Sequence, residues 1–80
     1  MLQIQFEYPI RGVNMQVIAC CKDVIGSEYV SGLTLTFLNE DDVRVHVPYD
    51  EDMFNDLEAE AIYMLADVYY NPELNFSHAH

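Results

Sequence analysis

Apolar and polar residues alternate along the first half of the chain with a period of two. The clearest segment is 2–8, "LQIQFEY", in which the apolar residues occupy the even positions. Successive side chains of a strand point to opposite faces, so this pattern is typical of a sheet with one buried face. Turn-forming residues separate similar segments further along, which favours an antiparallel meander. The predicted strands span 2–8, 13–21, 32–38 and 43–48.

Two parts of this first half are less regular. Apolar Ile18 interrupts the alternation in the second predicted strand, so a short helix over 16–24 is the alternative there. The segment 25–32, "IGSEYVSG", is framed by two glycines and predicts a loop.

From Asp50 onward the apolar period changes to about 3.6, which predicts an amphipathic helix over 50–70. Asp50 is the expected N-cap, and Tyr49 is placed to pack on Phe54 as a hydrophobic staple. Pro72 stops the helix, and a frayed tail is expected over 72–80. The predicted apolar stripe consists of Met53, Leu57, Ala61, Met64 and Val68, with Phe54 and Leu65 at its edge.

These elements predict one domain over 1–80 of the α+β class. In the expected fold, a four-stranded antiparallel sheet is packed on one face by a single C-terminal amphipathic helix. The 51% hydrophobic content supplies enough apolar surface for a folded chain despite a net charge of −11. Within 1–39 the net charge is −1, whereas 40–80 carries eleven acids against Arg44 alone. The acidity therefore belongs to the second half.

The helical projection gathers acids and tyrosines on the face opposite the apolar stripe. Acids spaced by four residues lie about 6 Å apart along a helix, and each such like-charge pair costs a few tenths of a kcal/mol. Helix stability therefore does not require them. The residues of this face are Asp52, Asp56, Glu60, Tyr63, Asp67 and Tyr70.

The simplest interpretation is a solvated face that keeps the protein soluble. Such surfaces usually mix both signs of charge, however, and one sign alone indicates a basic partner. Nucleic acid itself would be repelled, so the expected partner is the basic nucleic-acid-binding surface of another protein, with the tyrosines as apolar anchors. Glu40, Asp41 and Asp42 are the expected flanking patch.

In size, in acidity ("EDD", "DED" and the 50–70 helix) and in its lack of enzyme motifs, the chain resembles the small phage-encoded inhibitors of bacterial defence. This class includes anti-CRISPR and anti-restriction proteins that mimic DNA. The resemblance implies an inhibitor that blocks nucleic-acid access to its partner in the cytoplasm of a bacterial host. The alternative is a small structural or assembly domain that mediates oligomerisation, with the acidic face serving solubility. The protein itself is expected to be a monomer or a homodimer.

Other chemistries lack their sequence signals. No phosphate loop, nucleophile elbow or H-E-x-x-H helix occurs, so we expect no enzyme activity and no cofactor. Cys20 and Cys21 are adjacent and lack zinc spacing, and the terminal His78 and His80 do not complete a metal site. The chain also lacks a signal peptide and a membrane-spanning apolar run, which indicates a soluble cytoplasmic protein.

Overall fold

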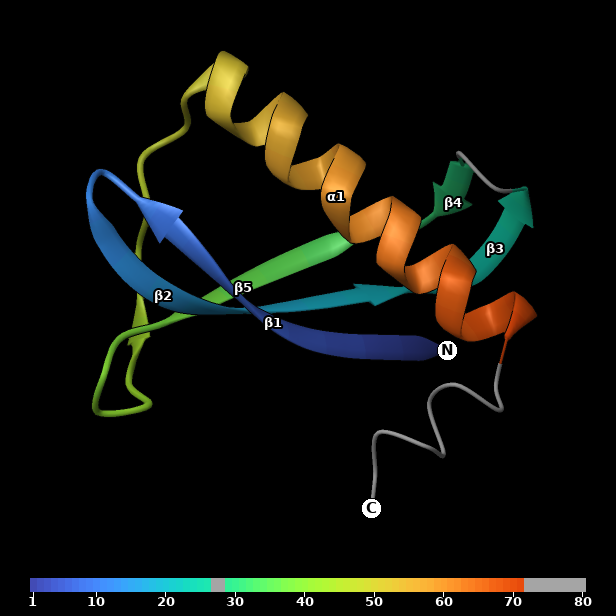
Figure 1. The fold of residues 1–80 in the computed structure, drawn as a ribbon, viewed down its shortest axis with the longest axis horizontal. Helices are drawn as coiled ribbons and strands as arrows, with labels where there is room; N and C mark the ends of the chain where they lie inside the picture. The colour runs from blue at the N-terminus through green and yellow to red at the C-terminus, as the bar shows by residue number, and fades with distance from the viewer. Residues whose placement is uncertain (27–28, 72–80) are drawn as a thin grey trace.

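The computed structural model describes residues 1–26 and 29–71. It has an α+β fold, in which helix α1 (Glu51–Tyr70) lies across one face of a four-stranded antiparallel sheet (Figure 1). The strand order is β1-β2-β5-β6, which confirms the predicted architecture. A second, two-stranded sheet follows the end of β2. The strands are β1 (Leu2–Ile10), β2 (Val13–Cys21), β3 (Asp23–Gly26), β4 (Tyr29–Ser31), β5 (Thr34–Leu38) and β6 (Arg44–Val45).

Strands β1 and β2 form a tight hairpin whose register runs from Leu2 opposite Cys21 to Ile10 opposite Val13. The two turn residues, Arg11 and Gly12, have φ of 53° and 81°. Two positive φ angles define the type I′ turn, whose twist matches that of the flanking strands. β2 is a continuous strand, so the alternative of a helix over 16–24 is wrong.

The loop predicted over 25–32 is instead largely the β3–β4 hairpin. Val24 pairs with Val30, and the Lys22 N–H donates a hydrogen bond to the Ser31 carbonyl at 2.8 Å. This bond carries the β2–β5 pairing onward into the smaller sheet. The two strands are short and lie beside glycines, so their apolar pattern is hard to recognise in the sequence. Val30 is nevertheless buried and packs with Ala61 and Leu65 of α1. Residues 27 and 28 lie outside the described part of the chain.

Gly32 sits where the main sheet passes into the β3–β4 sheet. Its φ is +66°, and a Cβ added at this position would lie 3.0 Å from Cγ of Lys22. A left-handed backbone and a close side chain together restrict the position to glycine. This residue therefore lets the chain bend so that β3 and β4 contact α1.

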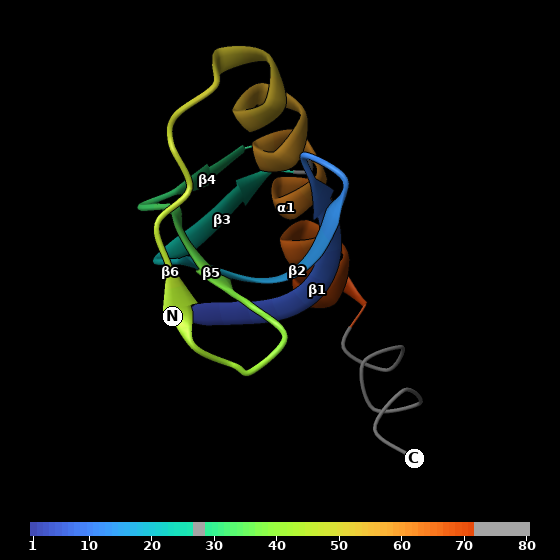
Figure 2. The same ribbon diagram turned by 90° about the vertical axis from the view of Figure 1, so that its left-hand side faces the viewer.

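The fourth predicted strand is much shorter than expected. Only Arg44 and Val45 pair with β5, opposite Leu38 and Phe37. Pro48 has no N–H for a ladder, and the segment from 46 to 50 leaves the sheet and runs to the start of α1 (Figure 2).

Both predicted features of the helix start are confirmed. Oδ1 of Asp50 accepts a hydrogen bond from the Met53 N–H at 3.2 Å, and the rings of Tyr49 and Phe54 pack edge to face with centroids 5.0 Å apart. The helix ends before Asn71, whose N–H donates to the Asp67 carbonyl at 2.8 Å. The predicted tail at 72–80 lies outside the described residues.

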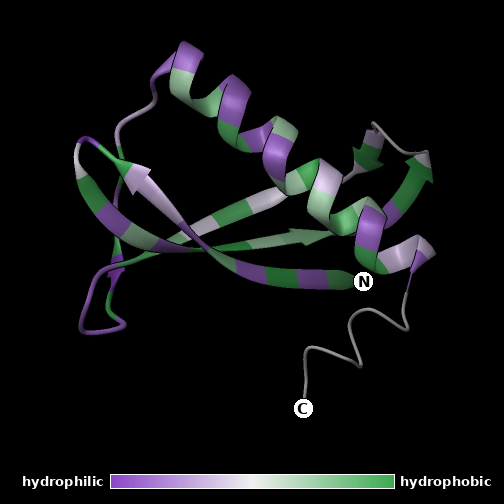
Figure 3. Cartoon of the chain, in the orientation of Figure 1, coloured by the Kyte–Doolittle hydropathy of each residue, from purple (hydrophilic) through white to green (hydrophobic). Residues whose placement is uncertain are grey.

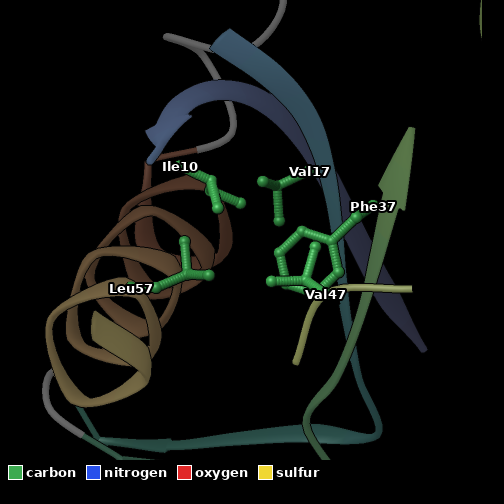
Figure 4. Close-up of a cluster of buried hydrophobic side chains, with 5 residues drawn as sticks. All are labelled: Ile10, Val17, Phe37, Val47 and Leu57. Atoms are coloured by element: carbon green, nitrogen blue, oxygen red, sulfur yellow. The ribbon is translucent and has the colours of Figure 1, made fainter. Parts of the chain in front are cut away.

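The core lies between α1 and the concave face of the sheets, in two adjoining clusters. Hydropathy alternates along β1 (Figure 3). Its apolar residues Leu2, Ile4, Phe6 and Tyr8 pack against the two clusters. In one cluster, Leu57 of α1 points toward side chains from the sheet and from Val47 (Figure 4). The buried members of that cluster are Ile10, Val17, Phe37, Val47 and Leu57. Those of the other are Ala19, Cys21, Val30, Ala61 and Leu65.

The buried stripe of α1 is rotated from the predicted one. Leu65 was expected at the edge but is fully buried, whereas Met64 and Val68 are only half-buried. The reason is the β3–β4 sheet, which contacts the helix on the Leu65 side.

We expect Gly32→Ala to lower the free energy of unfolding by about 1–2 kcal/mol, because the new Cβ meets Lys22 in a left-handed backbone. Gly26→Ala is the matched control, since a Cβ there meets no atom within 4 Å. Urea denaturation followed by circular dichroism measures both. Equal losses at the two positions would contradict the bend at Gly32.

Candidate protein-binding surface

The predicted binding residues of α1 lie together on the outside of the molecule. We call this set the acidic face, and all of its members are exposed. Tyr63 is 72% exposed and Tyr70 is 54% exposed, so both aromatic side chains are accessible on this face. The acidic face consists of Asp52, Asp56, Glu60, Tyr63, Asp67 and Tyr70.

The orientation of the acidic face follows from the packing of the opposite side. Leu57, Ala61 and Leu65 are fully buried against the sheets, and their spacing of four residues fixes which side of the helix meets the core. The capped N-terminus fixes where the helix begins. The acidic face is therefore held in one orientation on a rigid element.

Helix stability explains only one of the four acids. Asp52 lies in the first turn, where the helix dipole favours a negative charge. Asp56 and Glu60 continue the i, i+4 series and repel their neighbours. Asp67 lies in the last turn, where the dipole disfavours an acid and no basic residue is present.

The side chain of Asp67 is nevertheless positioned. Its Oδ1 accepts a hydrogen bond from Nδ2 of Asn71 at 3.1 Å. This bond is exposed and holds the carboxylate at the C-terminal end of the acidic face. No Lys, Arg or His occurs anywhere in α1 to neutralise the face.

The second acidic segment, Glu40, Asp41 and Asp42, forms the turn between β5 and β6. Asn39 organises the turn, since its Oδ1 accepts hydrogen bonds from the N–H groups of Asp41 at 2.9 Å and Val43 at 3.0 Å. The Asp42 N–H donates to the Asn39 carbonyl at 3.0 Å, and Asp42 has φ 60°. This is a three-residue hairpin loop with its last residue left-handed. The three carboxylates project from a defined backbone.

The structure does not bring this turn to the acidic face. In both views the turn lies at the end of the sheet away from α1 (Figures 1 and 2). The reason is the segment 46–50, which carries the chain across the molecule before the helix starts. The two acidic regions are separate surfaces.

A groove beside the acidic face was missed in the sequence. It has a volume of about 430 Å³ and lies between the start of β1 and the C-terminal half of α1. Tyr63 and Asp67 belong to both the groove and the acidic face. The sequence held one signal for this groove: the predicted meander places the first strand at an edge of the sheet. The lining residues are Leu2, Gln3, Ile4, Gln5, Tyr63, Met64, Asp67 and Val68.

Comparison of the chain with protein families, curated proteins and solved structures found no match. The function of this surface must therefore be inferred from its own geometry and charge.

The remaining reactive side chains do not form a second site within 1–26 and 29–71. No three His, Cys, Asp or Glu side chains in these ranges are grouped to hold a metal ion. Burial raises the pKa of the Cys21 thiol, and the neighbouring Cys20 and Asp23 raise it further. His46 is exposed, and His78 and His80 lie outside the described residues. Over the same ranges, no helix is both long and apolar enough to cross a membrane.

We expect Asp56→Asn to stabilise the fold by about 0.5 kcal/mol, because it removes repulsion from both Asp52 and Glu60. Asp52→Asn is the control: it relieves one repulsion but loses the favourable interaction with the helix N-terminus, so no gain is expected. Thermal unfolding at low salt and at about 1 M salt, where charges are screened beyond about 3 Å, measures both. Equal gains would point to net charge rather than local spacing.

The two thiols should differ in reactivity, since Cys20 is partly exposed and Cys21 is buried. With a disulfide reagent at pH 8, we expect one thiol to react in the native protein and two after denaturation. The Cys20→Ser variant should react slowly, because the raised pKa of Cys21 keeps its thiolate population low. Fast reaction of native Cys20→Ser would show that the strand end opens readily.

Proposed function

We propose that this protein is a small acidic inhibitor that binds a basic nucleic-acid-binding surface of another protein and blocks nucleic-acid access. The observation that carries the proposal is the acidic face of α1. Four exposed carboxylates of one sign lie there with two exposed tyrosines, without a basic residue in the helix. A rigid rod of negative charge is suited to a groove that normally holds a phosphate backbone.

The spacing of the acids supports this mode of binding. Asp52, Asp56 and Glu60 follow one another at a rise of about 6 Å, comparable to the distance between successive phosphates of a strand. Lys and Arg side chains that contact phosphates can contact carboxylates in the same way. Tyr63 and Tyr70 continue the line and offer apolar area with a polar tip, a combination enriched at binding hot spots.

The separate turn at 40–42 has a different role in this proposal. Its distance from α1 keeps it out of a contact centred on the helix. Its three charges still add to the field that steers a basic partner toward the protein. We therefore assign the acidic face to the contact and the turn to association.

The chain resembles the phage-encoded anti-defence inhibitors in size, in acidity and in its lack of enzyme motifs. We accordingly extend the proposal to an anti-CRISPR or anti-restriction role, with the partner in the cytoplasm of a bacterial host. A basic nuclease or its guide complex is the kind of partner that this surface fits.

The test compares two variants that remove the same charge from different places. The helix variant is Asp52→Asn, Asp56→Asn and Glu60→Gln; the turn variant is Glu40→Gln, Asp41→Asn and Asp42→Asn. A partner is captured from bacterial lysate and identified by mass spectrometry, and its binding is measured by surface plasmon resonance at two salt concentrations. Displacement of labelled DNA from the purified partner is followed by fluorescence anisotropy.

We expect the helix variant to lose about 2–5 kcal/mol of affinity, mostly through faster dissociation, and to stop displacing DNA. The turn variant should associate more slowly and keep its dissociation rate. Equal losses of affinity in both variants would show that binding depends on the net charge and not on the acidic face. If the helix variant is folded and binds with undiminished affinity, the contact does not lie on α1.

A domain that mediates oligomerisation is the second candidate, favoured by the open edge of β1 in the sheet. It predicts self-association that persists or strengthens with salt, because an apolar interface between two acidic copies gains from screening. Sedimentation velocity at both salt concentrations distinguishes it from the inhibitor.

A further inference from the structure

Within residues 1–26 and 29–71, no strand pairs with the outer edge of β1, which is nine residues long. β1 is the first strand in the order β1-β2-β5-β6, so among the described strands only β2 pairs with it. Open edges present unpaired N–H and C=O groups and accept additional strands. The opposite edge is different, because β6 has only two paired residues.

The register shows which backbone groups face outward. In a hairpin with a two-residue turn, the residues flanking the turn form a hydrogen-bonded pair, here Ile10 and Val13. Hydrogen-bonded and non-hydrogen-bonded pairs then alternate. The even residues of β1 direct their backbone groups to β2, and Gln3, Gln5 and Glu7 direct theirs to the open edge.

The groove described above lies along the first half of this edge. Leu2 and Ile4 of β1 and Met64 and Val68 of α1 are half-buried and give it apolar walls. Tyr63 and Asp67 stand at its margin, and none of the described residues that line it is basic. A long aliphatic side chain with a positive end matches this combination, since its stem packs on the walls while its charge reaches Asp67.

We propose that β1 accepts an extended basic segment of a partner protein as an additional strand, with a Lys or Arg side chain in the groove beside Asp67. Main-chain hydrogen bonds to Gln3, Gln5 and Glu7 supply affinity, and the groove selects the alternate side chains. The proposed function contributes only the sign of the partner's charge to this inference. The open edge and the groove are independent of it.

A second copy of this chain fits the edge less well. Antiparallel pairing of two β1 edges would place both α1 helices on the same side of one continuous sheet, with the groove residue Asp67 of each copy beside the shared edge. Each copy carries a net charge of −11, so the pairing is opposed by repulsion. A basic segment gains from the same field.

The probe is a nine-residue synthetic peptide of alternating Thr and Lys, blocked at both ends, with a Thr–Glu peptide as the charge control. Amide exchange of the ¹⁵N-labelled protein is followed by nuclear magnetic resonance. With the Lys peptide near ten times its Kd, we expect exchange at Gln3, Gln5 and Glu7 to slow by about tenfold. The Glu peptide should give no protection.

Three protein variants and two modified peptides test the proposal further. Gln5→Pro removes one outward N–H and leaves the β2 ladder intact, and Gln5→Thr is its control. Asp67→Asn should weaken the Lys peptide by about two- to fivefold, as expected for an exposed ion pair. If Gln5→Pro fails to fold, two N-methylated peptides replace it, one methylated at every Thr and the other at every Lys. Only one of the two should lose binding, because only alternate N–H groups of the added strand face β1.

Protection of the three β1 amides, sensitive to one pattern of N-methylation, supports strand addition. Peptide-induced shifts confined to Asp52, Asp56 and Glu60 would overturn it while leaving the proposed function standing. Protection of β1 without peptide, together with dimerisation, would identify a second copy as the occupant and overturn the proposal. If the Lys peptide protects the β1 amides equally in the wild type and in the helix variant, strand addition is supported even when the proposed inhibitor role fails.

Discussion

The packing of three side chains of α1 on the sheet is the constraint on which the rest of the structure depends. Leu57, Ala61 and Leu65 have no exposed surface. Truncation of one such leucine costs about 2–5 kcal/mol, a large part of the stability of a small domain. The helix therefore cannot rotate, and everything on its outer side keeps a fixed direction. This contact therefore determines the orientation of the acidic face and the position of the groove beside β1.

The same comparison of magnitudes explains how the fold tolerates its charge. Each like-charge pair on α1 costs a few tenths of a kcal/mol, and the acid in the last turn costs a similar amount. These terms are small beside the burial of the core. A surface of one sign is therefore compatible with the fold. The exposed tyrosines of this surface lie outside the core and contribute little to folding.

The sequence predicts the parts of this structure that are governed by local rules. Alternation in β1 and β2, the Asp50 cap and the Tyr49–Phe54 staple all follow from residues close in the chain. It misses what depends on tertiary contact. The sequence predicts a loop in place of the β3–β4 hairpin, because the two strands are short and lie beside glycines. The packing of this hairpin on α1 rotates the buried stripe toward Leu65.

The candidate site divides in the same way. Helical periodicity correctly gathered the six residues of the acidic face on one exposed side. No periodicity relates the turn at 40–42 to the helix, and only the path of residues 46–50 reveals that the two lie apart. The groove cannot be predicted from the sequence, because its presence depends on how far α1 overlaps β1. Leu65 and Ala61 of α1 belong to the same core cluster against which Leu2 and Ile4 of β1 pack, so the overlap depends on tertiary contacts.

The position of α1 at the end of the described chain has a consequence for synthesis. The sheet is assembled from neighbouring hairpins, so its strands can pair as soon as they leave the ribosome. Their apolar side, with Phe6, Val17 and Phe37, then has no cover until residues 51–70 follow. During that interval the nascent chain displays an unprotected hydrophobic surface and an open strand edge together. Helix α1, which follows the strands in the chain, then closes the core and adds six of the fourteen acids.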